Sequence, residues 1–69
     1  MRIHVIFKGD KWLVTASDSR LIAEYDTKAA AVKKGITVAK EEKARLYIHK
    51  QDGSVDKVTE YGEKEAVDE

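Results

Sequence analysis

The first third of the chain alternates hydrophobic and polar residues, which is the pattern of strands with one buried face. Residues 2–8 follow this alternation and are rich in β-branched and aromatic side chains. Gly9 and Asp10 are typical turn residues, and the alternation returns in residues 11–16. We therefore expect these two strands to form a hairpin, followed by a shorter third strand at 20–25.

The hydrophobic period becomes helical after Asp26-Thr27, where either residue can cap a helix N-terminus. Residues 28–43 contain no proline and are dominated by alanine, lysine and glutamate, so we expect one helix there. Gly35 lies at the edge of the apolar stripe and costs about 1 kcal/mol relative to alanine in a helix interior. A close approach of the helix to the sheet is the expected reason for this glycine. The stripe itself is formed by Ala29, Val32, Ile36 and Ala39.

Two more strands are expected at 45–50 and 54–61, and the loop between them decides which face Val58 joins. A two-residue loop pairs Gln51 with Ser54 and turns Val58 to the face away from the helix. A three-residue loop pairs Lys50 with Ser54, with Gly53 as a left-handed bulge, and turns Val58 toward the core. We favour the three-residue loop because it gives the more apolar core face.

The expected architecture is α+β, a small antiparallel sheet in the order β-β-β-α-β-β with one helix packed on one face. Residues 1–62 form a single domain, and the acidic residues 63–69 form a disordered tail. The core should contain Trp12, Val14, Val32, Ile36, Leu46 and Ile48. One helix cannot cover both faces of the sheet, so the second face is left to solvent or to a partner. It should carry His4, Ile6, Tyr47 and His49.

The composition of the chain argues against several classes of function. The chain has 69 residues, 13 basic and 13 acidic side chains, no cysteine and two histidines. Two histidines without cysteine cannot build a closed four-ligand zinc site, so no metal or other cofactor is expected. No run approaches the roughly 20 apolar residues of a membrane span, and the first residues lack the longer apolar region of a signal peptide. We expect no membrane association and a cytoplasmic protein.

Four segments carry a likeness to a known family. They are Trp12-x-Val14, then Asp26-Thr27-x-Ala29 before an alanine-rich helix, then Leu46-x-Ile48-His49-x-x-Asp52-Gly53, and finally Tyr61-Gly62. From about His4 to Gly62 the chain resembles the bacterial family known as domain of unknown function 2188. It departs from that pattern at Gly35, where alanine is expected, and at Ala16-Ser17, which lacks a basic or glycine residue. The resemblance implies no activity, because the family is named for lacking one.

Catalysis is not expected. The sequence has no cysteine nucleophile, no G-x-S-x-G elbow, no glycine-rich phosphate loop and no H-E-x-x-H motif, so we predict no catalytic residue. His49 is the sharpest candidate for a general base or a ligand, since imidazole titrates near neutral pH. We favour a strand histidine bonded across to a neighbour such as Asp56.

Two non-catalytic functions remain. We rank first an interaction module that pairs with itself, as a homodimer, or with another protein through the uncovered sheet face. The alternative is a nucleic-acid-binding domain that uses the open sheet face or the basic helix. The solvated face of an amphipathic helix also explains these lysines, so nucleic acid is not favoured. The candidate basic patch is Lys33, Lys34 and Lys40.

Overall fold

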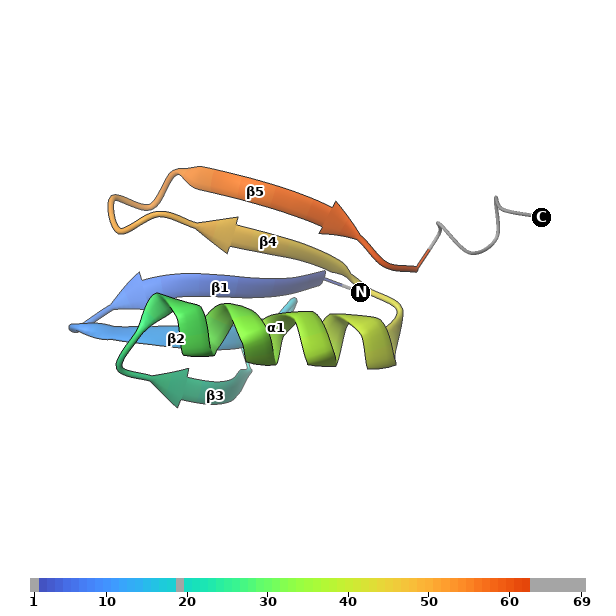
Figure 1. The fold of residues 1–69 in the computed structure, drawn as a ribbon, viewed down its shortest axis with the longest axis horizontal. Helices are drawn as coiled ribbons and strands as arrows, with labels where there is room; N and C mark the ends of the chain where they lie inside the picture. The colour runs from blue at the N-terminus through green and yellow to red at the C-terminus, as the bar shows by residue number, and fades with distance from the viewer. Residues whose placement is uncertain (1, 19, 63–69) are drawn as a thin grey trace.

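Five strands and one helix make up the computed structural model, which describes residues 2–18 and 20–62 (Figure 1). The α+β element order is the predicted one. The acidic segment 63–69, expected to be a disordered tail, lies outside the described residues. The elements are β1 (Arg2–Lys8), β2 (Lys11–Ala16), β3 (Leu21–Tyr25), α1 (Lys28–Glu42), β4 (Arg45–His49) and β5 (Val55–Glu60).

The sheet is mixed, which corrects the expectation of an antiparallel one. Its strand order is β3-β2-β1-β4-β5, and β4 lies parallel to β1 with Ile3 opposite Leu46. The reason is the crossover through α1, which leaves the β3 edge, passes over one face and returns beside β1. Since β3 already runs in the direction of β1, a strand that follows such a crossover is also parallel to β1. The other three pairings are antiparallel, as predicted.

The helix begins and ends with specific backbone partners. The Thr27 hydroxyl accepts a hydrogen bond from the Ala30 N–H at 3.3 Å, which confirms one of the two predicted caps. At the other end Lys43 adopts a left-handed conformation, with φ of 54°. The next N–H, that of Ala44, donates to the Ala39 carbonyl at 2.9 Å. The chain thus turns sharply into β4.

The buried face of α1 is made of its smallest residues. Ala31, Gly35 and Ala39 are buried, whereas Ala29, which we expected on this stripe, is exposed. The physical reason is that small side chains let the helix backbone come close to the sheet. A Cβ atom built on Gly35 would lie 2.9 Å from Val5 Cγ2. This contact confirms the close approach predicted from the glycine.

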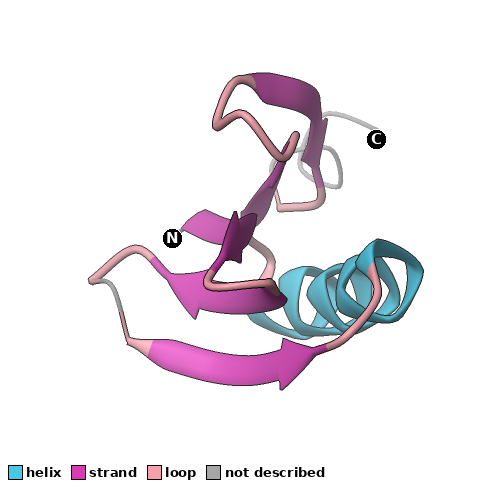
Figure 2. Cartoon of the chain, turned by 90° about the vertical axis from the view of Figure 1, so that its left-hand side faces the viewer, coloured by secondary structure: helices cyan, strands magenta, loops and turns pink. Residues whose placement is uncertain are grey.

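The core lies between α1 and the sheet. Ile3, Val5, Val14 and Leu46 are fully buried. The predicted core residues Trp12, Val14, Leu46 and Ile48 are buried, and Val32 and Ile36 are partly buried against them. The helix packs on β1, β2, β3 and β4, while β5 lies beyond it at the edge of the sheet (Figure 2).

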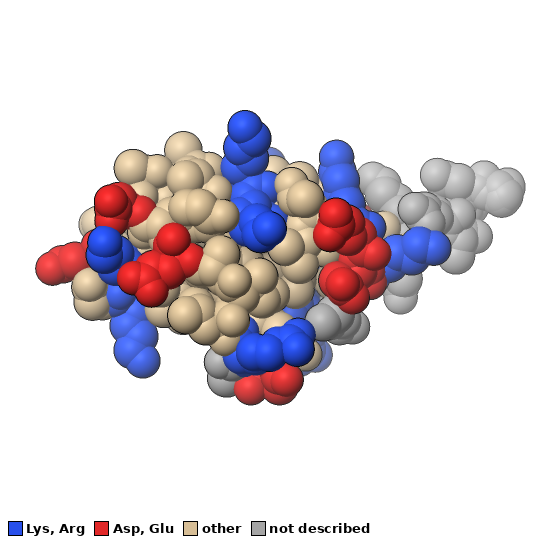
Figure 3. Space-filling model, turned by 90° about the horizontal axis from the view of Figure 1, so that it is seen from below, with Lys and Arg blue, Asp and Glu red and all other residues tan. Residues whose placement is uncertain are grey.

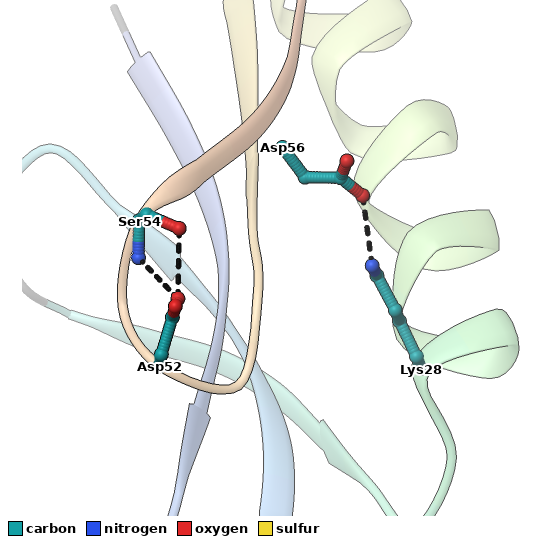
Figure 4. Close-up of polar contacts among 4 residues, drawn as sticks. All are labelled: Lys28, Asp52, Ser54 and Asp56. Atoms are coloured by element: carbon teal, nitrogen blue, oxygen red, sulfur yellow. Dashed lines mark hydrogen bonds and ion pairs between the residues drawn. The ribbon is translucent and has the colours of Figure 1, made fainter.

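The β4–β5 hairpin has the predicted loop. The Lys50 N–H donates to the Ser54 carbonyl at 2.8 Å, and the Gly53 N–H donates to the Lys50 carbonyl at 3.0 Å. Gly53 has φ of +94°, a left-handed conformation that favours glycine. The loop is also held by the Asp52 carboxylate, which accepts from the Ser54 backbone N–H and hydroxyl (Figure 4).

The predicted face of Val58 is wrong, although the loop is right. The register shifts between Ile48 and His49: His49 lies opposite Val55, but Ile48 lies opposite Lys57. Asp56 is therefore an extra residue in β5, a bulge, and every later side chain moves to the other face. Val58 lies opposite Tyr47, away from the helix, and is 47% exposed.

Candidate functional site

The sheet face opposite α1, called the open face below, gathers residues from all five strands. Strand register defines it. His4 lies between Thr15 on β2 and Tyr47 on β4, and directly opposed residues point to the same side of a sheet. His49 follows Tyr47 by two positions and therefore joins the same face. Ile6 follows His4 in the same way, so the structure brings together the four residues predicted for this face.

Exposed apolar side chains concentrate on the open face. Among residues 2–18 and 20–62, the large hydrophobic side chains classed as exposed are Leu21, Val55 and Val58. Leu21 pairs with Thr15, Val55 with His49, and Val58 with Tyr47. All three therefore lie on the open face, toward its two edges.

A shallow hollow adds to this apolar surface on the β1–β2–β3 side. It has a volume of about 260 Å³ and is lined by Ile6, Lys8, Leu13, Thr15 and Leu21. The open face thus has apolar side chains at both ends, in the hollow at one end and in the two valines of β5 at the other.

Two histidines and a tyrosine form the centre of the open face. His4 Nδ1 lies 3.3 Å from His49 Nε2, and the His4 ring stacks on Tyr47 with centroids 5.0 Å apart and an interplanar angle of 17°. The second ring nitrogen of His49, Nδ1, lies 3.4 Å from the Gly53 carbonyl oxygen. The parallel β1–β4 pairing makes this cluster, because it places residue 4 beside residues 47 and 49.

The expected bond from His49 to Asp56 is absent from the contacts of these described residues, and its absence has a clear cause. Val55 lies on the open face, so Asp56, the next residue, lies on the helix side, where its carboxylate accepts a hydrogen bond from Lys28 Nζ at 2.9 Å (Figure 4). Lys28 Nζ also lies 5.6 Å from the centre of the Trp12 ring. Asp56 therefore ties β5 to the start of α1, and His49 pairs with His4 instead.

Hydrogen bonds link Arg45 to Tyr47 and to Glu60 beside the two histidines. Arg45 Nη1 donates to the Tyr47 hydroxyl at 3.3 Å, and Arg45 Nε donates to Glu60 Oε1. The hydrogen bond from Arg45 lowers the pKa of Tyr47, because the guanidinium stabilises the phenolate. These links hold the Tyr47 ring in position beside His4.

The candidate basic patch lies on α1, the helix for which it was predicted, and away from the open face. Lys33 and Lys40 are exposed and Lys34 is partly buried, all on α1 at the other side of the sheet. Seen from below, basic side chains stand apart with acidic ones among them (Figure 3). Neither a group of three potential metal-ligating side chains nor a helix able to cross a membrane occurs in the part of the chain that the structure describes.

Comparison with known proteins identifies the family. Residues 3–61 match the family described as "Uncharacterized protein conserved in bacteria (DUF2188)". The chain belongs to the DUF2188 family. This confirms the likeness carried by the Trp12, Asp26-Thr27 and Ile48-His49 segments. Searches of curated proteins and of solved structures found no match to the chain.

Three of the apolar residues on the open face of this DUF2188 domain were missed by sequence reasoning. Val58 and Leu21 reach the face through bulges, one at Asp56 in β5 and one between Val14 and Thr15 where β2 meets β3, and Val55 reaches it through its pairing with His49. One pattern in the sequence does predict the observed face of Val58. Counting back from Glu60 in steps of two places Val58 on the same side of the strand as the polar residues. The competing alternation from Gly53 pointed to the core.

The histidine cluster makes the stability of this DUF2188 domain pH-dependent. Burial, followed by the nearby His49 and the positive charge of Arg2, lowers the pKa of His4 below its usual 6.5. A lowered pKa in the folded state means that neutral His4 stabilises the fold. That stability is full above pH 6.5 and is lost as the pH falls through the lowered folded value.

We therefore expect the melting temperature to fall between pH 7 and pH 5, and the fall to be smaller in His4→Asn. Thermal unfolding followed by circular dichroism measures it. The carboxyl groups with lowered pKa values, those of Asp26, Asp52 and Asp56, titrate below this window and do not obscure it. An identical fall in wild type and His4→Asn would contradict the assignment.

Proposed function

We propose that this DUF2188 domain is a non-catalytic interaction module that associates with a second copy of itself through the open face. The observation that carries the proposal is the placement of Leu21, Val55 and Val58, all exposed and all on one face. Large apolar side chains exposed on one face, here at both of its edges, are typical of interaction sites in soluble proteins.

The charges of the open face support a self-complementary partner. Two cations of the open face are balanced by carboxylates, because Arg45 pairs with Glu60 and Lys11 pairs with Asp26. The whole chain has 13 basic and 13 acidic residues and a formal net charge of zero. Two copies can therefore face each other without strong repulsion.

The size of the open face also supports a second copy. Five strands spaced about 4.8 Å apart, each about 20 Å long, give roughly 500 Å² per copy. Two copies then bury about 1,000 Å² or more, which reaches the lower size of biological interfaces. The mixture of aromatic, aliphatic and titratable side chains is that of a recognition surface rather than of a core.

The proposal includes a non-catalytic role in the cytoplasm. On the open face, His4 contacts His49 and stacks on Tyr47. The contacts of this titratable pair are thus with each other and with a tyrosine, rather than with a nucleophile. The lack of cysteine fits the reducing environment of the cytoplasm.

The test is the molar mass in solution, by sedimentation equilibrium in EDTA. We expect wild type to dimerise, and Tyr47→Glu and Val58→Glu each to shift the equilibrium to monomer by about tenfold or more while the melting temperature stays nearly unchanged. Ala29→Glu is the matched control, because it adds the same charge at an exposed position on α1. A wild type that stays monomeric, or charged open-face variants that dimerise like Ala29→Glu, would contradict the proposal.

A second candidate, single-stranded nucleic acid, is favoured by one observation on the open face rather than on the helix. The His4–Tyr47 stack adjoins Arg2 and Arg45, which lie directly opposite each other on β1 and β4. Aromatic rings beside cations suit base stacking and phosphate contact. Retention of a labelled single-stranded oligonucleotide at low salt, lost in Arg45→Glu, would favour this function. Monomeric wild type with no retention would leave neither candidate standing.

A further inference from the structure

The separation between the two histidines is that of two ligands on one metal ion. His4 Nδ1 and His49 Nε2 are 3.3 Å apart. Two imidazole nitrogens at about 2.0–2.1 Å from a tetrahedral zinc ion are about 3.3–3.4 Å from each other. Small ring rotations would point both lone pairs at a common ion.

The ring of His49 is also held in the tautomer that a metal needs. Its Nδ1 lies 3.4 Å from the Gly53 carbonyl oxygen, so Nδ1–H can donate there and leave a lone pair on Nε2. Metal-binding histidines commonly donate their other ring N–H to a carbonyl in this way. His4 Nδ1 is then the donor to His49, and on metal binding its proton moves to Nε2 of the same ring, with no net change in charge.

The electrostatic surroundings favour neutral imidazole. Partial burial of the ring and the positive charge of Arg2 both disfavour a protonated His4. The positive charge of Arg2 repels a bound metal cation, whereas the charge of Arg45 is balanced by Glu60. Nitrogen ligands select late transition metals such as Zn²⁺ over Mg²⁺ or Ca²⁺.

We propose that His4 and His49 chelate a divalent transition-metal ion, with Zn²⁺ as the probe, and that the same pair from a second copy completes a four-imidazole site. One chain supplies only two such ligands, because it has two histidines and no cysteine. A two-fold axis through the centre of the open face brings four together. This inference rests on the proposed self-association, and it adds that a metal ion controls it.

The experiment is a titration of the untagged chain with ZnCl₂ at pH 7.5, followed by calorimetry and by sedimentation equilibrium. We expect half an equivalent of Zn²⁺ per chain, with a dissociation constant below about 10 μM, and a shift toward dimer. His4→Asn and His49→Asn should each weaken binding by about 100-fold. Thr37→Ala, at an exposed position of α1 outside the open face, should bind like wild type. Binding should weaken at pH 5.5, where protons compete for the rings.

Three results would overturn the inference: no heat of binding up to about 1 mM Zn²⁺, one equivalent bound with no change in mass, or full binding by His49→Asn. The metal-free arm keeps the two proposals separable. Dimerisation in EDTA that ZnCl₂ does not change would leave the proposed function intact and reject the metal site.

Discussion

Replacing Trp12 by alanine should strongly destabilise the protein. Trp12 is 6% exposed, and its ring packs against Phe7 with centroids 5.0 Å apart. Truncation of a buried tryptophan to alanine costs about 3–5 kcal/mol, because both transfer energy and packing are lost. A domain of this size has a total stability of about 3–10 kcal/mol. The loss therefore removes much or all of the stability.

Urea denaturation followed by circular dichroism measures this effect. Trp12→Phe is the control, since it keeps an aromatic ring against Phe7 and should lose clearly less stability than Trp12→Ala. The Lys28 ammonium above the indole adds a smaller contribution that both variants alter. A Trp12→Ala protein with the denaturation midpoint of wild type would mean that the ring does not fill the core.

Gly35→Ala should destabilise the protein by about 1–3 kcal/mol, against the trend of helix propensity. Alanine is favoured over glycine by about 1 kcal/mol in a helix interior, so propensity alone predicts a gain. The added Cβ, however, would lie 2.9 Å from Val5 Cγ2 and 3.1 Å from Leu46 Cδ1. Both neighbours are fully buried side chains with little room to move. The packing conflict therefore outweighs the propensity.

Two further variants isolate the cause of the Gly35 effect. Thr37→Ala changes an exposed position of the same helix and should be neutral or slightly stabilising, which reports propensity alone. In Gly35→Ala combined with Val5→Ala, the cavity made by the second change accepts the new methyl group. The double variant should therefore lose less stability than the sum of the losses in the two single variants. Strict additivity would show that Gly35 is not in close contact with Val5.

The bulge at Asp56 explains why the hairpin prediction was correct in its loop and wrong in its strand. Loop geometry is local: Gly53 takes a positive φ, and Asp52 holds the Ser54 N–H. The bulge lies at Asp56, whose carboxylate bonds to Lys28 at the start of α1, a partner 28 positions away in the chain. No local pattern in β5 contains that information.

The candidate site could be predicted only in part for the same reason. His4, Ile6, Tyr47 and His49 were placed on one face by alternation alone, and the structure agrees. That His4 touches His49 follows from the parallel pairing of β1 and β4, with His4 opposite Tyr47. The alternation pattern does not pair these two strands with each other, so it could not place His4 beside His49.

Alternation, capping residues and turn chemistry were sufficient for the element order, the helix start at Thr27 and the left-handed Gly53, because each depends on a few neighbouring residues. The strand order and the parallel β1–β4 pair follow from the crossover of α1 across the sheet, and the two bulges appear only in the strand pairings of the tertiary structure. The packing of α1 on the sheet selected Ala31, Gly35 and Ala39 as the buried helix face. Strand partners distant in sequence gain their stability from contacts that form only when the helix covers one face. The opposite face, with its valines and paired histidines, is the surface that this packing leaves open.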